Sequence, residues 1–173
     1  MSTLPSVRPP LQGLLEWLDG HDVTYELHEH PATVTARETA RVEHVDPRTF
    51  AKTLAVTTDD GRRALLVVEA SDMLDLLKAA RALGARHARL LTEPEMEDLA
   101  PACDLGTIPP IGALCGLPVV ADHAIRDDEW LSFHAGSHGH SVRVEREAWE
   151  AAAGVTYADL AEEQDARPRW AWS

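Results

Sequence analysis

The chain is short of positive charge and of cysteine. Its 173 residues include 16 Lys and Arg against 29 Asp and Glu, a formal net charge of −13 at pH 7, and only two cysteines. Binding of DNA, or of any nucleic acid by bulk electrostatics, is not expected, because phosphate neutralisation requires clustered cations. Cys103 and Cys115 lie outside any CxxC pattern and are expected to be reduced packing residues.

Long apolar runs are also absent. No stretch approaches the roughly 18 apolar residues of a membrane span, and the opening MSTLPSVRPP has no apolar core of a secretion signal. We therefore expect a cytoplasmic protein without a membrane partner. The sequence has neither GxxxxGK nor GxGxxG, so we expect no nucleotide cofactor.

What the sequence does contain fits one globular domain. It is 45% apolar and 26% charged, and its length suffices for one core with a pocket. We expect this domain to span residues 10–165, with a flexible N-terminal arm at 1–9 and a C-terminal tail at 166–173.

Local patterns predict helices and short strands in the first half. Leucines spaced as on one helix face predict a helix over 11–20, and VTYELHEH predicts a strand that stops at Pro31. Capping-box spacing at Thr35 predicts a helix over 36–45. The Asp-Gly step in DDGRR predicts a hairpin of FAKTLAVTT and RALLVVEA.

The second half continues in the same way. A helix capped by Ser71 should carry Met73, Leu76, Leu77 and Ala80 on one face and end at Gly84, and a capping box at Thr92 predicts another helix. A Gly- and Pro-rich loop, a buried strand at 118–122, a last strand pair and a short helix around Trp149 follow. The expected fold class is α+β, a single domain with a curved, mixed but mostly antiparallel sheet flanked by helices.

Lys52 is unusual among the cations, because fourteen of the sixteen are arginine. In a strand of period two it shares a face with Phe50, Leu54 and Val56. An ammonium on an apolar face must reach the rim or line a cavity, since burying it unpaired is costly. Two readings stay open: an edge lysine that covers apolar surface, and a cation on the wall of a site.

The basic residues Lys78, Arg81, Arg86 and Arg89 form one island without an acid among them. The island is either a solvated helix face with the turn after it or a contact for a phosphate backbone.

Six motifs, in order, resemble the YbaK/ProX family of aminoacyl-tRNA editing domains, over roughly residues 11–163. They are FAKTLAV, DLLKAARALGA, GTIPPIG, LPVVADHAI, FHAGSHGHSVRV and GVTYADLAEE. The resemblance implies a hydrolase that deacylates mischarged tRNA in trans, with the tRNA 3′ acceptor end as partner and prolyl-tRNA synthetase as a possible second one. It implies a small amino acid such as Cys or Ala on tRNA-Pro as the substrate.

The resemblance also implies the roles of particular residues. Lys52 would be the essential lysine, and the glycine-to-proline loop at 106–110 would wall the aminoacyl pocket. The residues expected to bind substrate are Thr53, His28, His30, Gly106, Thr107, Ile108, Pro110, Gly112, Asp122, Gly136 and Ser137. Because an aminoacyl ester is already activated, positioning and electrostatic stabilisation of the oxyanion would suffice for hydrolysis.

Three other functions are consistent with parts of the sequence. His28, His30, His134, His138 and His140 invite a metal site, although no metal is expected, because HExxH and a helical pair with a carboxylate are absent. AGSHG around Ser137 lacks the first glycine of a nucleophile elbow, so a catalytic serine is not expected. A module that binds aminoacyl-tRNA or a synthetase without hydrolysis is the main alternative.

Overall fold

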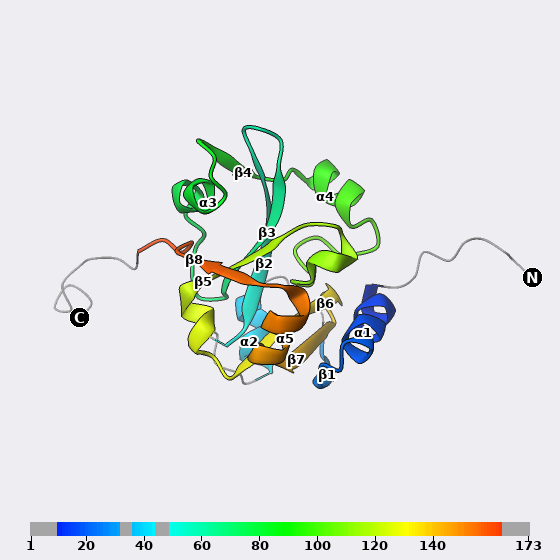
Figure 1. The fold of residues 1–173 in the computed structure, drawn as a ribbon. Helices are drawn as coiled ribbons and strands as arrows, with labels where there is room; N and C mark the ends of the chain where they lie inside the picture. Colours follow the sequence, from blue (N-terminus) through cyan, green and yellow to red (C-terminus); the bar gives the residue numbers. More distant parts are fainter. Residues whose placement is uncertain (1–9, 32–35, 44–48, 164–173) are drawn as a thin grey trace, which may run out of the picture.

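The computed structural model describes residues 10–31, 36–43 and 49–163, and structural statements below refer to these (Figure 1). The arm at 1–9, the tail at 166–173 and the cap at Thr35 lie outside the described residues. The helices are α1 Pro10–Gly20, α2 Ala36–Val42, α3 Leu76–Ala82, α4 Glu93–Leu99 and α5 Arg146–Ala153, with 3-10 turns at Gly112–Leu114 and His123–Asp127. None of the described helices has the length and apolar character needed to cross a membrane.

The strands form two sheets. They are β1 Tyr25–Glu29, β2 Ala51–Thr58, β3 Arg63–Glu69, β4 Ala88–Leu90, β5 Val119–Asp122, β6 Trp130–Ser137, β7 His140–Glu145 and β8 Thr156–Ala158. The smaller sheet has the order β1-β7-β6 and the larger one β4-β2-β3-β5-β8. β5 runs parallel to both β3 and β8, and the other pairs are antiparallel.

The α+β fold class is confirmed, but the expected curved sheet is divided in two. The sheets meet where Phe50, just before β2, bridges Ser132 of β6. The main core lies between the sheets, where Leu14 and Leu18 of α1 and Trp149 of α5 join residues of both. This arrangement covers the larger sheet on one face with the smaller sheet and its helices.

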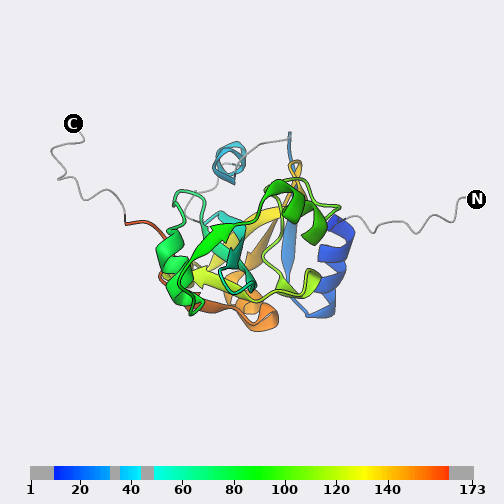
Figure 2. The same ribbon diagram turned by 90° about the horizontal axis from the view of Figure 1, so that it is seen from above.

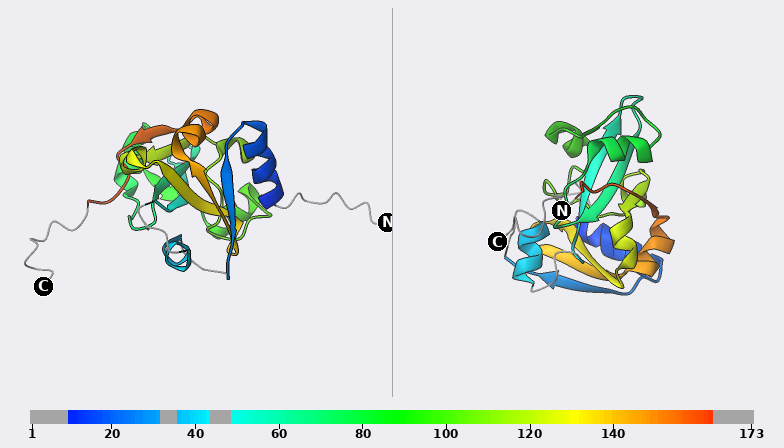
Figure 3. Two further views of the ribbon diagram at one scale, coloured as in Figure 1. Left: turned by 90° about the horizontal axis from the view of Figure 1, so that it is seen from below. Right: turned by 90° about the vertical axis from the view of Figure 1, so that its left-hand side faces the viewer.

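The opposite face of the larger sheet has its own core beneath α3, which includes Val56, Leu66 and Ala79. A third, small cluster of Ala36, Ala40, Phe50 and Ala70 lies under α2. Figures 2 and 3 show α2 outside both sheets, on one side of the molecule. α2 therefore packs with few apolar side chains.

The predicted start of α3 is wrong. The helix is capped by Asp75, whose side chain accepts hydrogen bonds from the backbone N–H groups of Leu77 and Lys78, and not by Ser71. The segment before it is held by tertiary contacts, since Leu74 forms a bridge with Ala161. Consequently Met73 (63% exposed) and Leu77 (67%) lie outside the core, and the buried helix residues are Ala79 and Ala80.

Candidate functional site

Lys52 lies near the start of β2 and is half-buried. It shares a face of the strand with Leu54 and Val56, which belong to the core beneath α3. The opposite face is also buried, with Ala51 and Ala55 in the main core. Lys52 thus has the apolar neighbours that the strand pattern predicts. Both faces of β2 are buried, however, so the strand has no solvent-exposed face.

Thr53 points away from Lys52, because successive strand residues face opposite sides of a sheet. Its side chain is 7% exposed and its hydroxyl has no hydrogen-bond partner among the described residues. On the edge of β2 away from β3, β4 pairs with residues 56–58, and the N–H of Leu91 donates to the carbonyl of Ala55 (3.0 Å). Lys52 and Thr53 therefore lie beyond the stretch of β2 that β4 covers.

The glycine-to-proline loop and the turn after β6 are joined by backbone hydrogen bonds. The N–H of Gly136 donates to the carbonyl of Thr107 (3.0 Å), and the N–H of Asp104 donates to the carbonyl of Gly136 (3.0 Å). The N–H of His138 donates to Oδ2 of Asp104 at 3.1 Å. Gly106 and Thr107 thus lie close to Gly136 and Ser137, although they are thirty residues apart.

Within this loop the side chains face the protein. Thr107 is fully buried and its hydroxyl donates to the carbonyl of Asp104 (2.7 Å), while Ile108 is 5% exposed in the main core. The carbonyl of Pro110 accepts from Nε1 of Trp149 (2.9 Å). Only Gly106, with φ of 81°, is exposed. This loop would therefore meet a ligand mainly through its backbone.

An apolar cavity of about 300 Å³ lies beside the loop. It is lined by Pro10 and Gly13 of α1, residues 99–103 at the end of α4 and just after it, the loop residues Ile108, Pro109 and Ile111, and Leu114 with Cys115. Lys52 is not among its lining residues. Cys103 and Cys115 are free thiols, and burial raises the pKa of Cys103 to about 11, which fits packing residues better than reactive ones.

His28 and His30 differ in burial and in the residues that they contact. The ring of His28 is exposed and its Nε2 lies 3.5 Å from Oε2 of Glu26. The side chain of His30 is only 4% exposed, with Nε2 3.4 Å from Oε1 of Glu43. The side chain of His30 therefore lies in the interior, whereas His28 is a surface residue of β1.

Sequence reasoning missed a buried polar cluster under α2. His134 is 4% exposed, and its Nε2 shares a 2.7 Å hydrogen bond with Oγ1 of the fully buried Thr39. Glu43 contacts both His30 and the hydroxyl of Ser141. The signal was available, because Thr39 and Glu43 occupy the same helix face as two buried alanines, and buried polar groups require partners.

The imidazole of His134 is uncharged at neutral pH. Burial lowers its pKa to about 4, and the neighbouring rings of His138 and His30 act in the same direction. The His134 and His138 ring centroids lie 6.2 Å apart. A proton on His134 would have to be buried beside other imidazoles, so the neutral form is retained.

Ser137 and His140 form a pair in the turn between β6 and β7. Oγ of Ser137 and Nδ1 of His140 are 2.6 Å apart, and Nε2 of His140 lies 3.6 Å from an exposed carboxylate oxygen of Glu29. The same hydroxyl accepts from the N–H of Gly139 at 3.2 Å. These contacts are those of a side chain that closes a tight turn.

Asp122 has the contacts of a structural residue. Its Oδ1 accepts from the N–H groups of Leu160 (2.8 Å) and Ala161 (3.0 Å), and its Oδ2 accepts from that of Ala124 (3.0 Å). The carboxylate thereby fixes the residues that follow β8. A substrate contact of Asp122 stays a prediction that this geometry does not support.

The basic island is divided in the structure. Nζ of Lys78 donates to Oδ1 of Asp159 (3.0 Å) and to the carbonyl of Ala161 (2.8 Å), and the bond to Asp159 raises the lysine pKa. Arg81 and Arg86 are exposed and make no ion pair within the described part of the chain. Lys78 thus holds the segment at 159–161 against α3.

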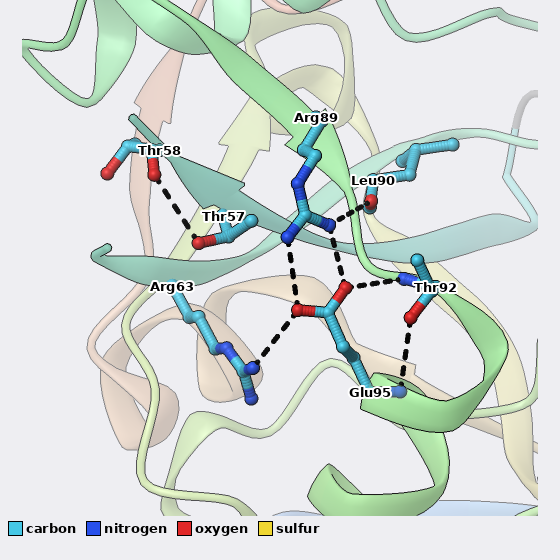
Figure 4. A network of polar contacts seen from close by, with 7 residues as sticks. All are labelled: Thr57, Thr58, Arg63, Arg89, Leu90, Thr92 and Glu95. Carbon is cyan, nitrogen blue, oxygen red and sulfur yellow. Dashed lines mark hydrogen bonds and ion pairs between the residues drawn. The ribbon is translucent and has the colours of Figure 1, made fainter. Parts of the chain in front are cut away.

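Arg89 is occupied by Glu95, as Figure 4 shows. The two side chains form hydrogen bonds of 2.7 and 3.1 Å, and Arg63 approaches the same carboxylate at 3.4 Å. Thr92 completes the predicted capping box with Glu95. The bond from Arg89, followed by that from the Thr92 backbone, lowers the pKa of Glu95 to about 2. Of the island, Arg81 and Arg86 remain for a phosphate contact.

The described histidines do not converge on a metal site. In the part of the chain that the structure describes, no group of three or more His, Cys, Asp or Glu side chains is placed to hold a metal ion.

The sequence of this chain is similar to those of aminoacyl-tRNA editing domains and of two proline–tRNA ligases. The family model of the aminoacyl-tRNA editing domain matches residues 30–152, which include Lys52, the glycine-to-proline loop and the turn after β6. Proline–tRNA ligases from two strains of Acidithiobacillus ferrooxidans are 32% identical over 93 residues. That match covers 54% of this chain and 16% of each ligase.

Solved structures share the fold. One of a candidate trans-editing enzyme for prolyl-tRNA synthetase superposes with a TM-score of 0.78 at 26% identity, covering 91% of this chain and 99% of that one. The hypothetical protein APE2540 also gives a TM-score of 0.78, at 21% identity, over 86% of this chain and 99% of its own, which bears on the fold alone.

Proposed function

This chain belongs to the aminoacyl-tRNA editing domain family, and from that premise we propose that it hydrolyses the ester bond of mischarged aminoacyl-tRNA. The family match carries the proposal, because its span contains both Lys52 and the glycine-to-proline loop. Lys52 offers a cation, the segment at 106–110 offers backbone groups near Gly136, and neither requires a cofactor.

In this proposal Lys52 is the catalytic residue. Its ammonium stabilises the negative charge that develops on the ester carbonyl oxygen or holds the terminal adenosine, while water attacks the carbonyl carbon. The half-buried position of the side chain strengthens such an interaction, because the effective dielectric is lower than in bulk water. The substrate's own ribose hydroxyl is the group available to activate the water.

The proposed substrate is a small amino acid, Cys or Ala, on tRNA-Pro. The support is the likeness to proline–tRNA ligases and to a candidate trans-editing enzyme for prolyl-tRNA synthetase. A rigid pocket rejects a side chain that is too large more effectively than one that is too small, so an editing site can spare the correct amino acid. Prolyl-tRNA synthetase is the proposed partner.

A panel of charged tRNAs tests this function. Alanyl-, cysteinyl- and seryl-esters on the tRNAs for proline, alanine and threonine should show rapid release of Cys or Ala from tRNA-Pro. Prolyl-tRNA-Pro should be spared, since its ring is bulkier than either side chain. Tight binding of the charged tRNAs with release no faster than in buffer would instead identify a module that binds without hydrolysis.

The two exposed arginines of the basic island allow a test of the tRNA surface. Charge reversal of Arg81 and Arg86 together should weaken tRNA binding and lower the slope of log affinity against log salt by about one per lost phosphate contact. The control carries Arg126→Glu and Arg143→Glu together, on a 3-10 turn and on β7, and changes the net charge by the same amount. Equal binding by the double variant and the control would exclude the island from the tRNA interface.

A further inference from the structure

His134 lies where β2 meets β6. Its ring packs edge-on against the fully buried ring of Phe50, with centroids 5.4 Å apart and planes at 67°. Phe50 bridges Ser132 and its carbonyl accepts the N–H of Ala70. The side chain of Phe50 is therefore a fixed point at the start of β2, two residues before Lys52.

The same imidazole is tied to α2. Thr39 is fully buried, and its hydrogen bond to Nε2 of His134 joins residues that are 95 positions apart in the sequence. The apolar contribution of α2 to this region is small, consisting of Ala36 and Ala40 packed with Phe50 and Ala70. A hydrogen bond between buried groups is directional, so it fixes the orientation of the His134 ring. Apolar contacts with alanine side chains would not do so.

The turn that follows His134 leads to the loop. Gly136, two residues later, is hydrogen-bonded through its backbone to Thr107 and Asp104. The ring of His134 also lies beside that of His138, with centroids 6.2 Å apart. A movement of His134 would therefore displace both the start of β2, which carries Lys52, and the glycine-to-proline loop.

We infer that His134 is a positioning residue for Lys52: held by Thr39, its ring sets the position of Phe50 and so the direction in which the lysine side chain leaves β2. The kinetic test of this role rests on the proposed function, whereas the spectroscopic test does not. His134 itself is buried and acts through Phe50, so it is not expected to touch the ester.

Lys52 can be observed directly, because the chain has only two lysines. Reductive methylation with ¹³C-formaldehyde labels Lys52, Lys78 and the α-amino group, and the Lys78→Arg variant assigns the lysine signals in a ¹H–¹³C spectrum. His134→Phe keeps a ring against Phe50 but removes the bond to Thr39. We expect this variant and Thr39→Val to displace the Lys52 signal by more than its linewidth, and His134→Gln to restore it in part.

Ser141→Ala is the matched control, because it removes another buried hydrogen bond under α2, the one to Glu43, from the residue opposite His134 on β7. It should leave the Lys52 signal in place. An unmoved signal in His134→Phe, or an equal displacement in Ser141→Ala, would overturn the inference. Thermal unfolding of each variant shows that the spectra are those of folded protein.

The activity readout separates positioning from general stability. With cysteinyl- or alanyl-tRNA-Pro, kcat should fall roughly 10-fold to 100-fold in His134→Phe and in Thr39→Val while KM changes little, since a small misplacement of a catalytic group acts on the transition state. The double variant should be no worse than the poorer single one. A rise in KM alone contradicts the inference. If the wild type is inactive on every ester but its Lys52 signal responds to His134→Phe, the proposed function fails and the positioning role stands.

Discussion

Lys52→Ala is expected to fold and to lose about 10²-fold to 10³-fold in kcat/KM for deacylation, the loss typical of removing one group that stabilises an oxyanion. The reason is that Lys52 supplies the positive charge in the proposed reaction, and an alanine leaves the developing negative charge to the loop backbone alone. Single-turnover hydrolysis of cysteinyl- or alanyl-tRNA-Pro measures the effect.

Two variants sharpen this result. Lys52→Arg keeps the charge but replaces a compact ammonium by a planar guanidinium, so it should recover only part of the rate. Arg62→Ala removes a cation at the tip of the β2–β3 hairpin, where it pairs with Asp60, and should retain wild-type activity. Wild-type rates in Lys52→Ala, with unfolding temperatures unchanged, would remove the catalytic assignment.

Gly112→Ala is expected to cause the largest loss of stability, about 3 kcal/mol, because overpacking of a rigid interior has costs of this size. A Cβ at this position would lie 1.9 Å from the carbonyl oxygen of Leu117 and 3.1 Å from Cγ2 of Val119. The clash is with backbone, which cannot rotate away. For a chain of this size such a loss corresponds to roughly 6–12 °C in the unfolding temperature.

Gly116→Ala is the matched control in the same turn. Gly116 has φ of 75°, and a Cβ added there would have no neighbouring atom within 4 Å among the described residues. Alanine at this position therefore meets only the strain of the left-handed conformation, about 1–2 kcal/mol. Differential scanning calorimetry should rank the wild type first, Gly116→Ala second and Gly112→Ala last. Equal losses in the two variants would show that the structure around Gly112 relaxes, so that the approach of Leu117 costs no more than left-handed strain at Gly116.

Local signals in the sequence were accurate wherever neighbours along the chain decide the structure. The Asp-Gly turn between β2 and β3, with Gly61 at φ of 85°, and the capping box of Thr92 depend on residues within a few positions of one another. The errors arose where distant residues compete with local ones. Ser71 and Asp75 are both acceptable caps, and the pairing of Leu74 with Ala161 favours Asp75.

The division into two sheets and the parallel pairing of β5 with β3 and β8 were not readable from periodicity. A buried strand looks the same whichever neighbours it has, and β8 consists of only three residues. The long-range polar contacts were equally hidden. Lys78 reaches Asp159, and Asp122 reaches Leu160, because the residues after β8 return beside α3 and β5.

The sequence by itself determined the order of elements, the α+β class and the family, since motif order and local propensity are properties of the chain. It singled out Lys52 by composition and strand phase. Only the tertiary structure decided which groups meet at the start of the strand that carries this lysine: Phe50 from before β2, His134 from β6 and Thr39 from α2. Such a cluster depends on how separate elements pack, and packing joins side chains whose separation along the chain carries no signal.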